Sequence, residues 1–134
     1  MKKILLTLFF ILSFNVRADW TEIDKNDRST SYIEYSRSKF TENEFDVWIK
    51  TDYSSNRPIN RRYEYNTLAV HITGICNQNQ IKYLYSEYRL DDKFVYKDQE
   101  YQFRETVPNS NDDKLLKMMC QIGQSKKANL SQLY

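Results

Sequence analysis

The pattern of apolar side chains changes its period once along this chain, at Pro108. Before that residue, Tyr, Phe, Val, Ile and Thr recur in short alternating runs, and the 134 residues include only two glycines and two prolines. Alternation of this kind is typical of strands with one buried face. After Pro108, apolar residues recur at helical spacing instead. The sequence therefore predicts an α+β fold, in which a single antiparallel sheet is followed by a C-terminal helix.

The clearest predicted strand spans residues 45–53. Its candidate core residues are Phe45, Val47, Ile49, Thr51 and Tyr53. The other candidate strands are 20–24, 31–35, 65–76, 81–90, 94–97 and 101–107. Turn-forming residues predict a loop at 54–61 and short turns at 77–79, 91–93 and 98–100. Because the patterns at 20–24 and 31–35 are short, we expect a meander of about five or six strands.

The strand at 65–76 predicts which side chains face the core. One side carries Leu68, Val70, Ile72 and Cys76. The opposite side carries Tyr65, Thr67, Ala69, His71 and Thr73. Gly74 interrupts the pattern, which predicts either a bulge or a close approach of another element.

The predicted helix spans residues 110–123. Ser110 is placed to cap the first turn, where Asp112 and Asp113 face the positive end of the helix dipole. Its apolar side carries Leu115, Leu116, Met119, Cys120 and Ile122. Gly123 predicts the helix end, and the polar segment 124–134 is expected to be a flexible tail. We therefore place one folded domain at residues 19–123.

Cys76 and Cys120 are the only two cysteines, so an intrachain disulfide has one pairing. That bond would close a loop of about 45 residues and stabilise the fold by roughly 4 kcal/mol in the chain-entropy model. The competing interpretations are free or intermolecular thiols, a redox pair and a metal site. The chain has no C-x-x-C motif, and His71 adds too few ligands for zinc. We expect a structural disulfide and no metal or cofactor.

Residues 1–18 have the pattern of a secretory signal peptide. Lys2 and Lys3 precede an apolar run at 4–14, and small residues precede an expected cleavage near Ala18. The run is about half of the roughly 20 residues that cross a bilayer. No cysteine lies near the cleavage position, so we expect no lipoprotein anchor. The mature chain should reach the periplasm or the cell exterior, where disulfides form.

Cleavage near Ala18 would also change the charge of the chain. The 20 basic residues would fall to 17, against 18 acidic residues, which gives a formal charge of −1. A nearly neutral domain lacks the broad positive field that attracts nucleic acid. No second apolar run has membrane-spanning length. We therefore expect neither a nucleic-acid partner nor a transmembrane segment.

Several short motifs follow one another in order through most of the mature chain. They are Tyr32-Ile33, Val47-Trp48, Tyr53-Ser54-Ser55, Cys76, Val107-Pro108-Asn109-Ser110 and Cys120. In this order and spacing, the chain resembles the surface-adhesin protein E family of small exported bacterial proteins. The resemblance implies a meandering antiparallel sheet with a disulfide-fastened C-terminal helix. It also implies binding to host extracellular-matrix proteins such as vitronectin and laminin.

The sequence does not predict an enzyme. His71 is the only histidine, and the spacing of the residues identifies no nucleophile or carboxylate partner for it. The adjacent carboxylates are Asp91, Asp92, Asp112 and Asp113. Turn formation and helix capping account for both pairs. Trp48 lies opposite the core set of its strand, so it is either part of a second packing layer or an exposed anchor.

Tyrosines and arginines in the middle of the chain are the candidate binding residues. Two pairs of tyrosines are each spaced by two residues, so each pair should project from one side of a strand. Two arginines precede the first pair. The predicted site comprises Arg61, Arg62, Tyr63, Tyr65, Tyr83 and Tyr85. Cross-strand packing is the alternative interpretation of these tyrosines.

A Tyr/Arg face favours protein binding, because both residue types are enriched at binding hot spots. Stacking of single-stranded bases would need a cationic groove, which the charge does not support. We therefore predict a non-enzymatic, adhesin-like protein that binds a macromolecular partner. The alternative is a periplasmic inhibitor of a hydrolase such as lysozyme. An exposed sheet edge would also allow a homodimer.

Overall fold

The computed structural model describes residues 19–131. The signal peptide predicted at 1–18 lies outside the described residues. The strands are β1 (Trp20–Lys25), β2 (Ser29–Glu34), β3 (Lys39–Phe40), β4 (Glu44–Pro58), β5 (Glu64–Ile75), β6 (Gln80–Leu90), β7 (Lys93–Asp98) and β8 (Arg104–Glu105). Two short 3-10 helices are η1 (Tyr35–Arg37) and η2 (Cys76–Gln78), and the α-helix is α1 (Asn111–Ser131).

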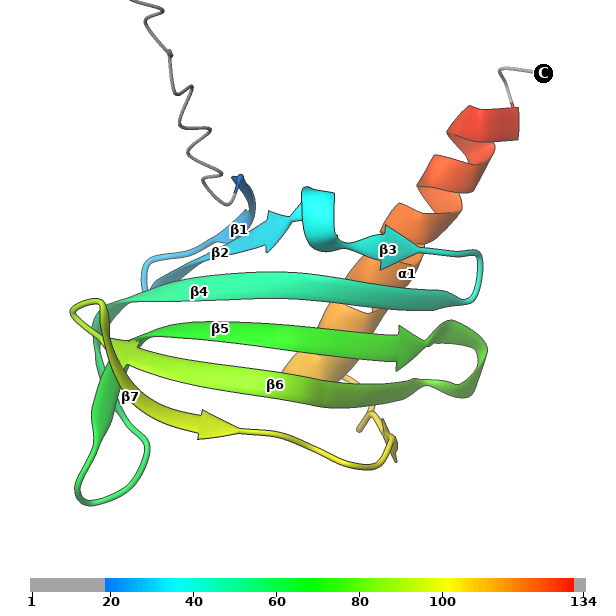
Figure 1. The fold of residues 1–134 in the computed structure, drawn as a ribbon. Helices are drawn as coiled ribbons and strands as arrows, with labels where there is room; N and C mark the ends of the chain where they lie inside the picture. Colours follow the sequence, from blue (N-terminus) through cyan, green and yellow to red (C-terminus); the bar gives the residue numbers. More distant parts are fainter. Residues whose placement is uncertain (1–18, 132–134) are drawn as a thin grey trace, which may run out of the picture.

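One antiparallel sheet contains all of these strands, and α1 crosses one of its faces (Figure 1). The strand order is β1-β2-β4-β5-β6-β7, with β3 beside β4 and β8 beside β6. The predicted α+β class is confirmed, but the sheet has eight strands rather than five or six. β3 has two residues and no counterpart among the predicted strands, and β8, also of two residues, lies within the strand predicted at 101–107. Two residues are too few to show an alternating pattern.

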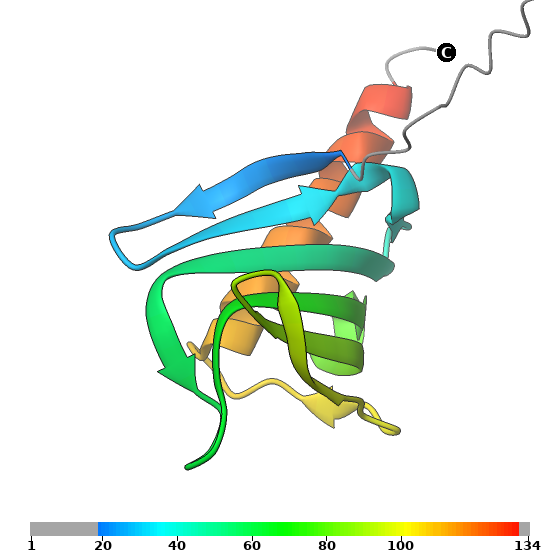
Figure 2. The same ribbon diagram turned by 60° about the vertical axis from the view of Figure 1, so that its left-hand side comes forward.

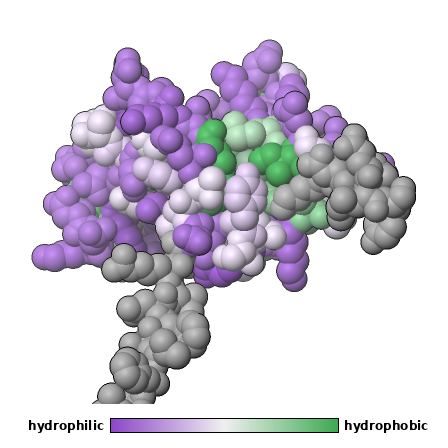
Figure 3. Space-filling model, turned by 90° about the horizontal axis from the view of Figure 1, so that it is seen from above, coloured by the Kyte–Doolittle hydropathy of each residue, from purple (hydrophilic) through white to green (hydrophobic). Residues whose placement is uncertain are grey.

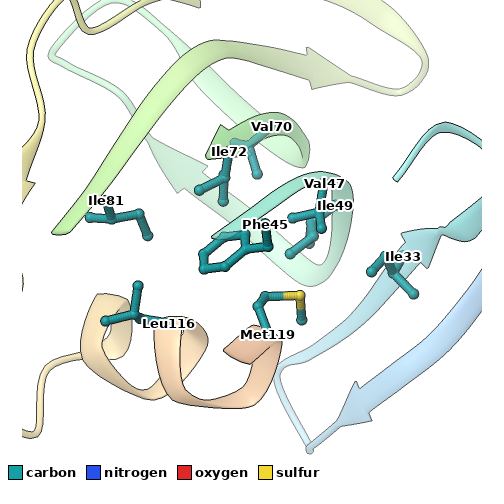
Figure 4. Close-up of a cluster of buried hydrophobic side chains, with 9 residues drawn as sticks. All are labelled: Ile33, Phe45, Val47, Ile49, Val70, Ile72, Ile81, Leu116 and Met119. Carbon is teal, nitrogen blue, oxygen red and sulfur yellow. The ribbon is translucent and has the colours of Figure 1, made fainter. Parts of the chain in front are cut away.

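The hydrophobic core lies between α1 and the adjacent face of the sheet (Figures 2 and 4). The buried apolar side chains are Ile33, Phe45, Val47, Ile49, Val70, Ile72, Ile81, Leu116 and Met119. The strand residues alternate with half-buried or exposed neighbours, as expected for a sheet with one covered face. Burial of each such side chain contributes roughly 1.5–3 kcal/mol. The inward sides predicted for 45–49 and 70–72 are confirmed.

Gly74 is a point of close approach within this core. Phe45 is paired with Gly74 across β4 and β5, and its ring occupies the space that a side chain at position 74 would need. Leu116 of α1 lies on the other side of that space, so a Cβ at position 74 would be 3.1 Å from its Cδ1. Gly74 therefore allows the phenyl ring to lie against the strand beneath the helix, as one of the two sequence interpretations predicted.

A disulfide joins Cys76 to Cys120, with an S–S distance of 2.13 Å. Cys76 follows the last residue of β5 and Cys120 lies in the third turn of α1, so the bond links the sheet directly to the helix. The predicted pairing is confirmed. Because the two residues are 44 positions apart in the chain, the bond also restricts a large part of the unfolded ensemble.

The start of α1 follows the predicted capping pattern. The Ser110 hydroxyl accepts a hydrogen bond from the Asp113 N–H at 3.2 Å. The buried Asp113 carboxylate accepts from the Asn109 N–H at 3.0 Å and from Lys117 Nζ at 2.8 Å. The hydrogen bond from Lys117 is the main reason that the pKa of Asp113 lies below its ordinary value, and the backbone bond from Asn109 adds to the effect.

The predicted helix end at Gly123 is wrong, because α1 continues to Ser131. No described glycine has a positive φ angle, so Gly123 does not form a left-handed helix cap. It is instead buried against the segment after β3, where an added Cβ would lie 2.8 Å from the carbonyl oxygen of Thr41. The glycine therefore serves helix packing, and part of the predicted tail is helical.

Two other boundaries differ from the prediction. β4 extends to Pro58, into the expected loop at 54–61, because a register shift between Asp52 and Arg57 lets the strand pairing resume. The expected strand at 101–107 is reduced to β8, which pairs only with Gln80 and Ile81 of β6. In the part of the chain that the structure describes, no helix is long and apolar enough to span a membrane.

The disulfide makes a measurable contribution to stability. Replacement of both cysteines by alanine should lower the free energy of unfolding by about 4 kcal/mol in the chain-entropy model. Urea unfolding of the oxidised protein and of the Cys76→Ala, Cys120→Ala variant measures the difference. Dithiothreitol should destabilise the original chain and leave the variant unchanged. A loss below about 1 kcal/mol would contradict the structural role.

Gly74→Ala tests the close approach of Phe45. The added methyl group overlaps a ring that is fully buried, so the free energy of unfolding should fall by roughly 1–3 kcal/mol. Thermal or urea unfolding measures the change. The matched rescue is Gly74→Ala combined with Phe45→Leu, which should lose less stability than the sum of the two single variants. Simple additivity of the two effects would show that the ring and the glycine do not interact.

Candidate functional site

The six predicted binding residues do not form one face. In β5 and β6, His71 is paired with Tyr85 while Ile72 is paired with Tyr83, so Leu84 is an additional residue that forms a bulge. The bulge turns Tyr83 toward the core and Tyr85 toward the opposite face. The prediction that this pair projects to one side is therefore wrong. The alternation rule failed here because it assumes an uninterrupted strand.

The other four predicted residues lie at the far end of the sheet. Arg61, Arg62 and Tyr63 belong to the loop between β4 and β5, and the ring of Tyr63 is 45% exposed. The Asn60 side chain shapes this loop by accepting hydrogen bonds from the N–H groups of Arg62 and Tyr63 at 2.8 and 3.1 Å. Figure 1 shows the loop projecting below the sheet at the left.

Tyr65 is part of a row of tyrosine rings rather than of a ladder with Tyr63. Its ring centroid lies 5.6 Å from that of Tyr53 and 4.8 Å from that of Tyr88, both in edge-to-face geometry. Tyr96 extends the row at 5.8 Å from Tyr88. Burial raises the pKa of Tyr53 and of Tyr88. These contacts support the cross-strand packing interpretation for Tyr65.

The face of the sheet opposite α1, which we call the open face, carries a different aromatic group. The ring of Trp48 stacks on that of His71 with centroids 4.6 Å apart and an interplanar angle of 10°. His71 Nε2 lies 2.5 Å from Asp46 Oδ1, which fixes the orientation of the imidazole. Tyr85 lies beside the indole at 6.2 Å. Adjacent strands hold these four residues, which gives the group a rigid base.

Cations surround the aromatic rings of the open face. The guanidinium of Arg37, from η1, lies 4.7 Å from the centre of the Trp48 ring. Lys50 Nζ lies 5.2 Å from the ring of Trp20 and 5.0 Å from that of Tyr32. Lys82 Nζ lies 4.6 Å from the ring of Phe103. These pairs, together with His71 and Tyr85, define the open-face cluster, which extends from β1 to β6.

A short polar chain borders the open-face cluster on β6. The Tyr85 hydroxyl donates to Glu87 at 3.1 Å, and Arg89 Nε donates to the same carboxylate at 2.9 Å. Burial and the bond to Glu87 raise the pKa of Tyr85. The hydrogen bond from Arg89 lowers the pKa of Glu87. The three groups therefore keep complementary charge states at neutral pH and hold the tyrosine ring in place.

A second polar network lies on the helix side of the sheet. The Tyr83 hydroxyl donates a short hydrogen bond to Asp112, and Arg104 Nη1 binds the same carboxylate at 2.7 Å. Arg104 also contacts Glu100 and lies 5.3 Å from the centre of the Tyr83 ring. Burial, followed by the bond to Asp112, raises the pKa of Tyr83 well above its ordinary value of 10.0. The network fastens β6 to the first turn of α1.

Sequence reasoning missed most of the open-face cluster. Alternation along β4 predicts that Trp48 points away from the core, and Lys50, two residues later, points to the same side. Tyr32 belongs to the short Tyr32-Ile33 motif, and its register opposite Lys50, which the sequence does not reveal, puts it on the same face. Arg37 and Phe103 lie outside the regular strands, so no alternating pattern could have located them. The sequence did place His71 correctly on the polar side of β5.

The His71 and Asp46 pair has no catalytic third member in the structure. Its neighbours are the Trp48 and Tyr85 rings, and neither is an activated nucleophile at hydrogen-bond distance from the imidazole. Within residues 19–131, no group of three or more His, Cys, Asp or Glu side chains is placed to hold a metal ion. The contacts observed in the open-face cluster are ring stacking, hydrogen bonds and cation–ring contacts.

The structure thus defines a small α+β domain with an aromatic surface on one face of its sheet. The family model for surface-adhesin protein E matches residues 20–121, and the chain belongs to that family. Membership supports an adhesin-like surface or exported protein that binds a partner without catalysis. Comparisons with curated proteins and with solved structures gave no match.

Tyr83→Phe tests the network that joins β6 to α1. Loss of the hydroxyl should lower the free energy of unfolding at pH 7 by about 1–2 kcal/mol. In the original chain, the unfolded state releases the phenolic proton near pH 10 while the folded state retains it, so stability should fall as the pH rises above 10.0. The variant should lack this part of the alkaline loss. Urea unfolding between pH 7 and 11 measures both effects.

The matched control is Tyr63→Phe, which removes the hydroxyl of an exposed ring. It should change the free energy of unfolding at pH 7 by less than about 0.5 kcal/mol. Equal losses in the two variants, or an unchanged alkaline slope in Tyr83→Phe, would contradict the role assigned to the network.

Proposed function

We propose that this protein is an exported adhesin that binds a host extracellular-matrix protein through the open-face cluster. The observation that carries the proposal is the stack of Trp48 on His71, bordered by Arg37 and Tyr85, on a sheet face that α1 leaves uncovered. Tryptophan, tyrosine and arginine are the residues most enriched at binding hot spots. Export would follow cleavage near Ala18, and the intact mass of the secreted protein checks that position.

The cluster has the properties of a preorganised binding surface. Rings held by strand pairing and stacking lose little conformational freedom when a partner binds, which limits the entropic cost of association. Lys50 and Lys82 take part in no ion pair in the described part of the chain. Their charges are therefore free to meet carboxylates of a partner, while the aromatic rings supply apolar contact area.

The loop between β4 and β5 favours a second candidate function. It projects from the sheet and carries Arg61, Arg62 and Tyr63, a shape suited to insertion into the cleft of a hydrolase (Figure 1). An inhibitor of a lysozyme would use this loop rather than the open face. The two functions therefore depend on different cations, so one pair of matched variants distinguishes them.

Lys50→Glu combined with Lys82→Glu should weaken binding to immobilised vitronectin or laminin at least about tenfold. The matched control, Arg61→Glu combined with Arg62→Glu, makes the same change in net charge and should remain within about twofold of the original chain. Surface plasmon resonance with the mature chain measures both affinities. Trp48→Leu, whose folding is checked by thermal unfolding, should also weaken binding.

Three outcomes would reject the proposed site. Loss of binding only in the loop variant would transfer the function to the β4–β5 loop, and protection of peptidoglycan from lysozyme would then support the inhibitor. Equal loss in both variants would indicate a general effect of charge. Failure of the original chain to bind either matrix protein would reject matrix adhesion itself.

A further inference from the structure

The helix covers only part of its face of the sheet, and a groove remains beside its first turns. The groove has a volume of about 460 Å³ and runs between the β1–β2 hairpin and α1. That volume is within the range of small-molecule sites. Figure 3 shows apolar surface gathered beside α1 between more hydrophilic surroundings. This groove lies on the opposite side of the sheet from the open-face cluster.

About half of the residues that line the groove are apolar or aromatic, and they form a continuous part of its floor and wall. They include Ile23, Ile49, Leu68, Val70, Ile72, Leu115 and Met118. Alternation from Thr21, which pairs with Ile33, directs Ile23 to the helix side of the sheet, and the register shift between Glu22 and Asp24 brings Asp24 opposite Ser31. The hydroxyls of Ser31 and Thr51 hydrogen-bond to each other at 2.9 Å. These two hydroxyls are therefore already paired with each other on the floor of the groove.

Three cations are part of the groove lining. The lining includes Arg28 from the β1–β2 turn, Arg57 from the end of β4 and Lys114 from α1. The Ser54 N–H donates to the Arg28 carbonyl at 2.9 Å, which holds the turn beside β4. Arg57 stacks on the ring of Tyr53 with its guanidinium 4.7 Å from the ring centre. None of the three cations forms an ion pair with another described residue.

The carboxylates of the groove do not balance these cations. Asp112 is already bound by Arg104 and by the Tyr83 hydroxyl, so its charge is neutralised within the fold. Asp24 is the other acidic residue of the lining. Three unpaired cations thus face one unpaired carboxylate beside an apolar surface. This charge distribution favours an anionic occupant that has an apolar body.

We infer that the groove binds a single-chain amphiphile with a carboxylate head, of the fatty-acid class. The alkyl chain lies on the apolar floor beneath α1, and the carboxylate lies between Arg28 and Arg57. Each buried methylene group contributes about 0.8 kcal/mol, so a chain of moderate length supplies most of the affinity. The arginines select the anionic head by charge-assisted hydrogen bonds.

A peptide fits this groove less well than an alkyl chain. The floor is formed by β2, β4 and β5, and each of these strands is paired on both sides. Their backbone groups are therefore occupied within the sheet, and an extended peptide would find few partners for its own N–H and C=O groups. An alkyl chain has no such requirement.

Isothermal titration calorimetry with dodecanoate below its micellar concentration tests the inference. Dodecanoate should bind the mature chain with one-to-one stoichiometry. Arg28→Glu combined with Arg57→Glu should weaken this binding at least tenfold. The matched control, Arg61→Glu combined with Arg62→Glu, has the same change in net charge and should bind dodecanoate within about twofold of the original chain. The side-chain methyl signals of Met118 and Leu68 should shift in NMR spectra on addition of dodecanoate.

Changes of ligand complete the experiment. Dodecanol should bind at least tenfold more weakly than dodecanoate, and dodecyltrimethylammonium should bind more weakly still. Equal affinities for the three amphiphiles, absence of dodecanoate binding, or an unchanged affinity in Arg28→Glu, Arg57→Glu would overturn the inference. Tighter binding of a capped Glu-Leu-Leu-Glu peptide than of dodecanoate would also overturn it, in favour of a peptide site.

The inference is independent of matrix adhesion. Lys50→Glu combined with Lys82→Glu should leave dodecanoate binding unchanged, because both lysines lie on the open face. Dependence of dodecanoate binding on those two lysines would place the amphiphile on the open face and contradict the groove site.

Discussion

The packing of Phe45 between Gly74 and Leu116 sets the distance between α1 and the sheet. The ring fills the space directly over the glycine, and the leucine of the helix closes that space from the other side. Cys76, two residues after Gly74, is then bound to Cys120, one turn after Leu116. A noncovalent contact and a covalent bond thus act on the same short segments. The helix position follows from both, and the rest of the domain is arranged around it.

This attachment gives the two faces of the sheet different properties. Under α1, side chains are buried and the polar groups of Tyr83, Asp112 and Arg104 bind one another. On the opposite face, which α1 does not cover, Trp48 and His71 are held by stacking and by the contact of the imidazole with Asp46. Because α1 crosses the sheet obliquely and covers only part of this face, the covered side also has an unfilled groove next to the β1–β2 hairpin. One helix position therefore creates two separate surfaces.

The sequence predicted those features that depend on regular periodicity or on pairing without alternatives. Val47 and Ile72 lie on the expected inner face, and two cysteines allowed one disulfide. Periodicity failed wherever the chain departs from a regular element. Leu84 forms a bulge that no local residue pattern marks, so simple alternation predicts that Tyr83 and Tyr85 share one side although the structure separates them. Gly123 was interpreted as a helix end because its role depends on a distant carbonyl, that of Thr41. Contacts of this kind exist only after the chain has folded.

The bulge at Leu84 has a consequence for comparing this chain with its relatives. Beyond the bulge, each side chain of β6 points to the face of the sheet opposite to the one it would have in a strand without the bulge. A relative that lacks one residue here could have a similar aromatic sequence, but its aromatic side chains would lie on the opposite face of the sheet. A sequence alignment of this segment would then equate residues whose side chains lie on opposite faces of the sheet. Insertions and deletions near position 84 are consequently more informative about ligand choice than substitutions are.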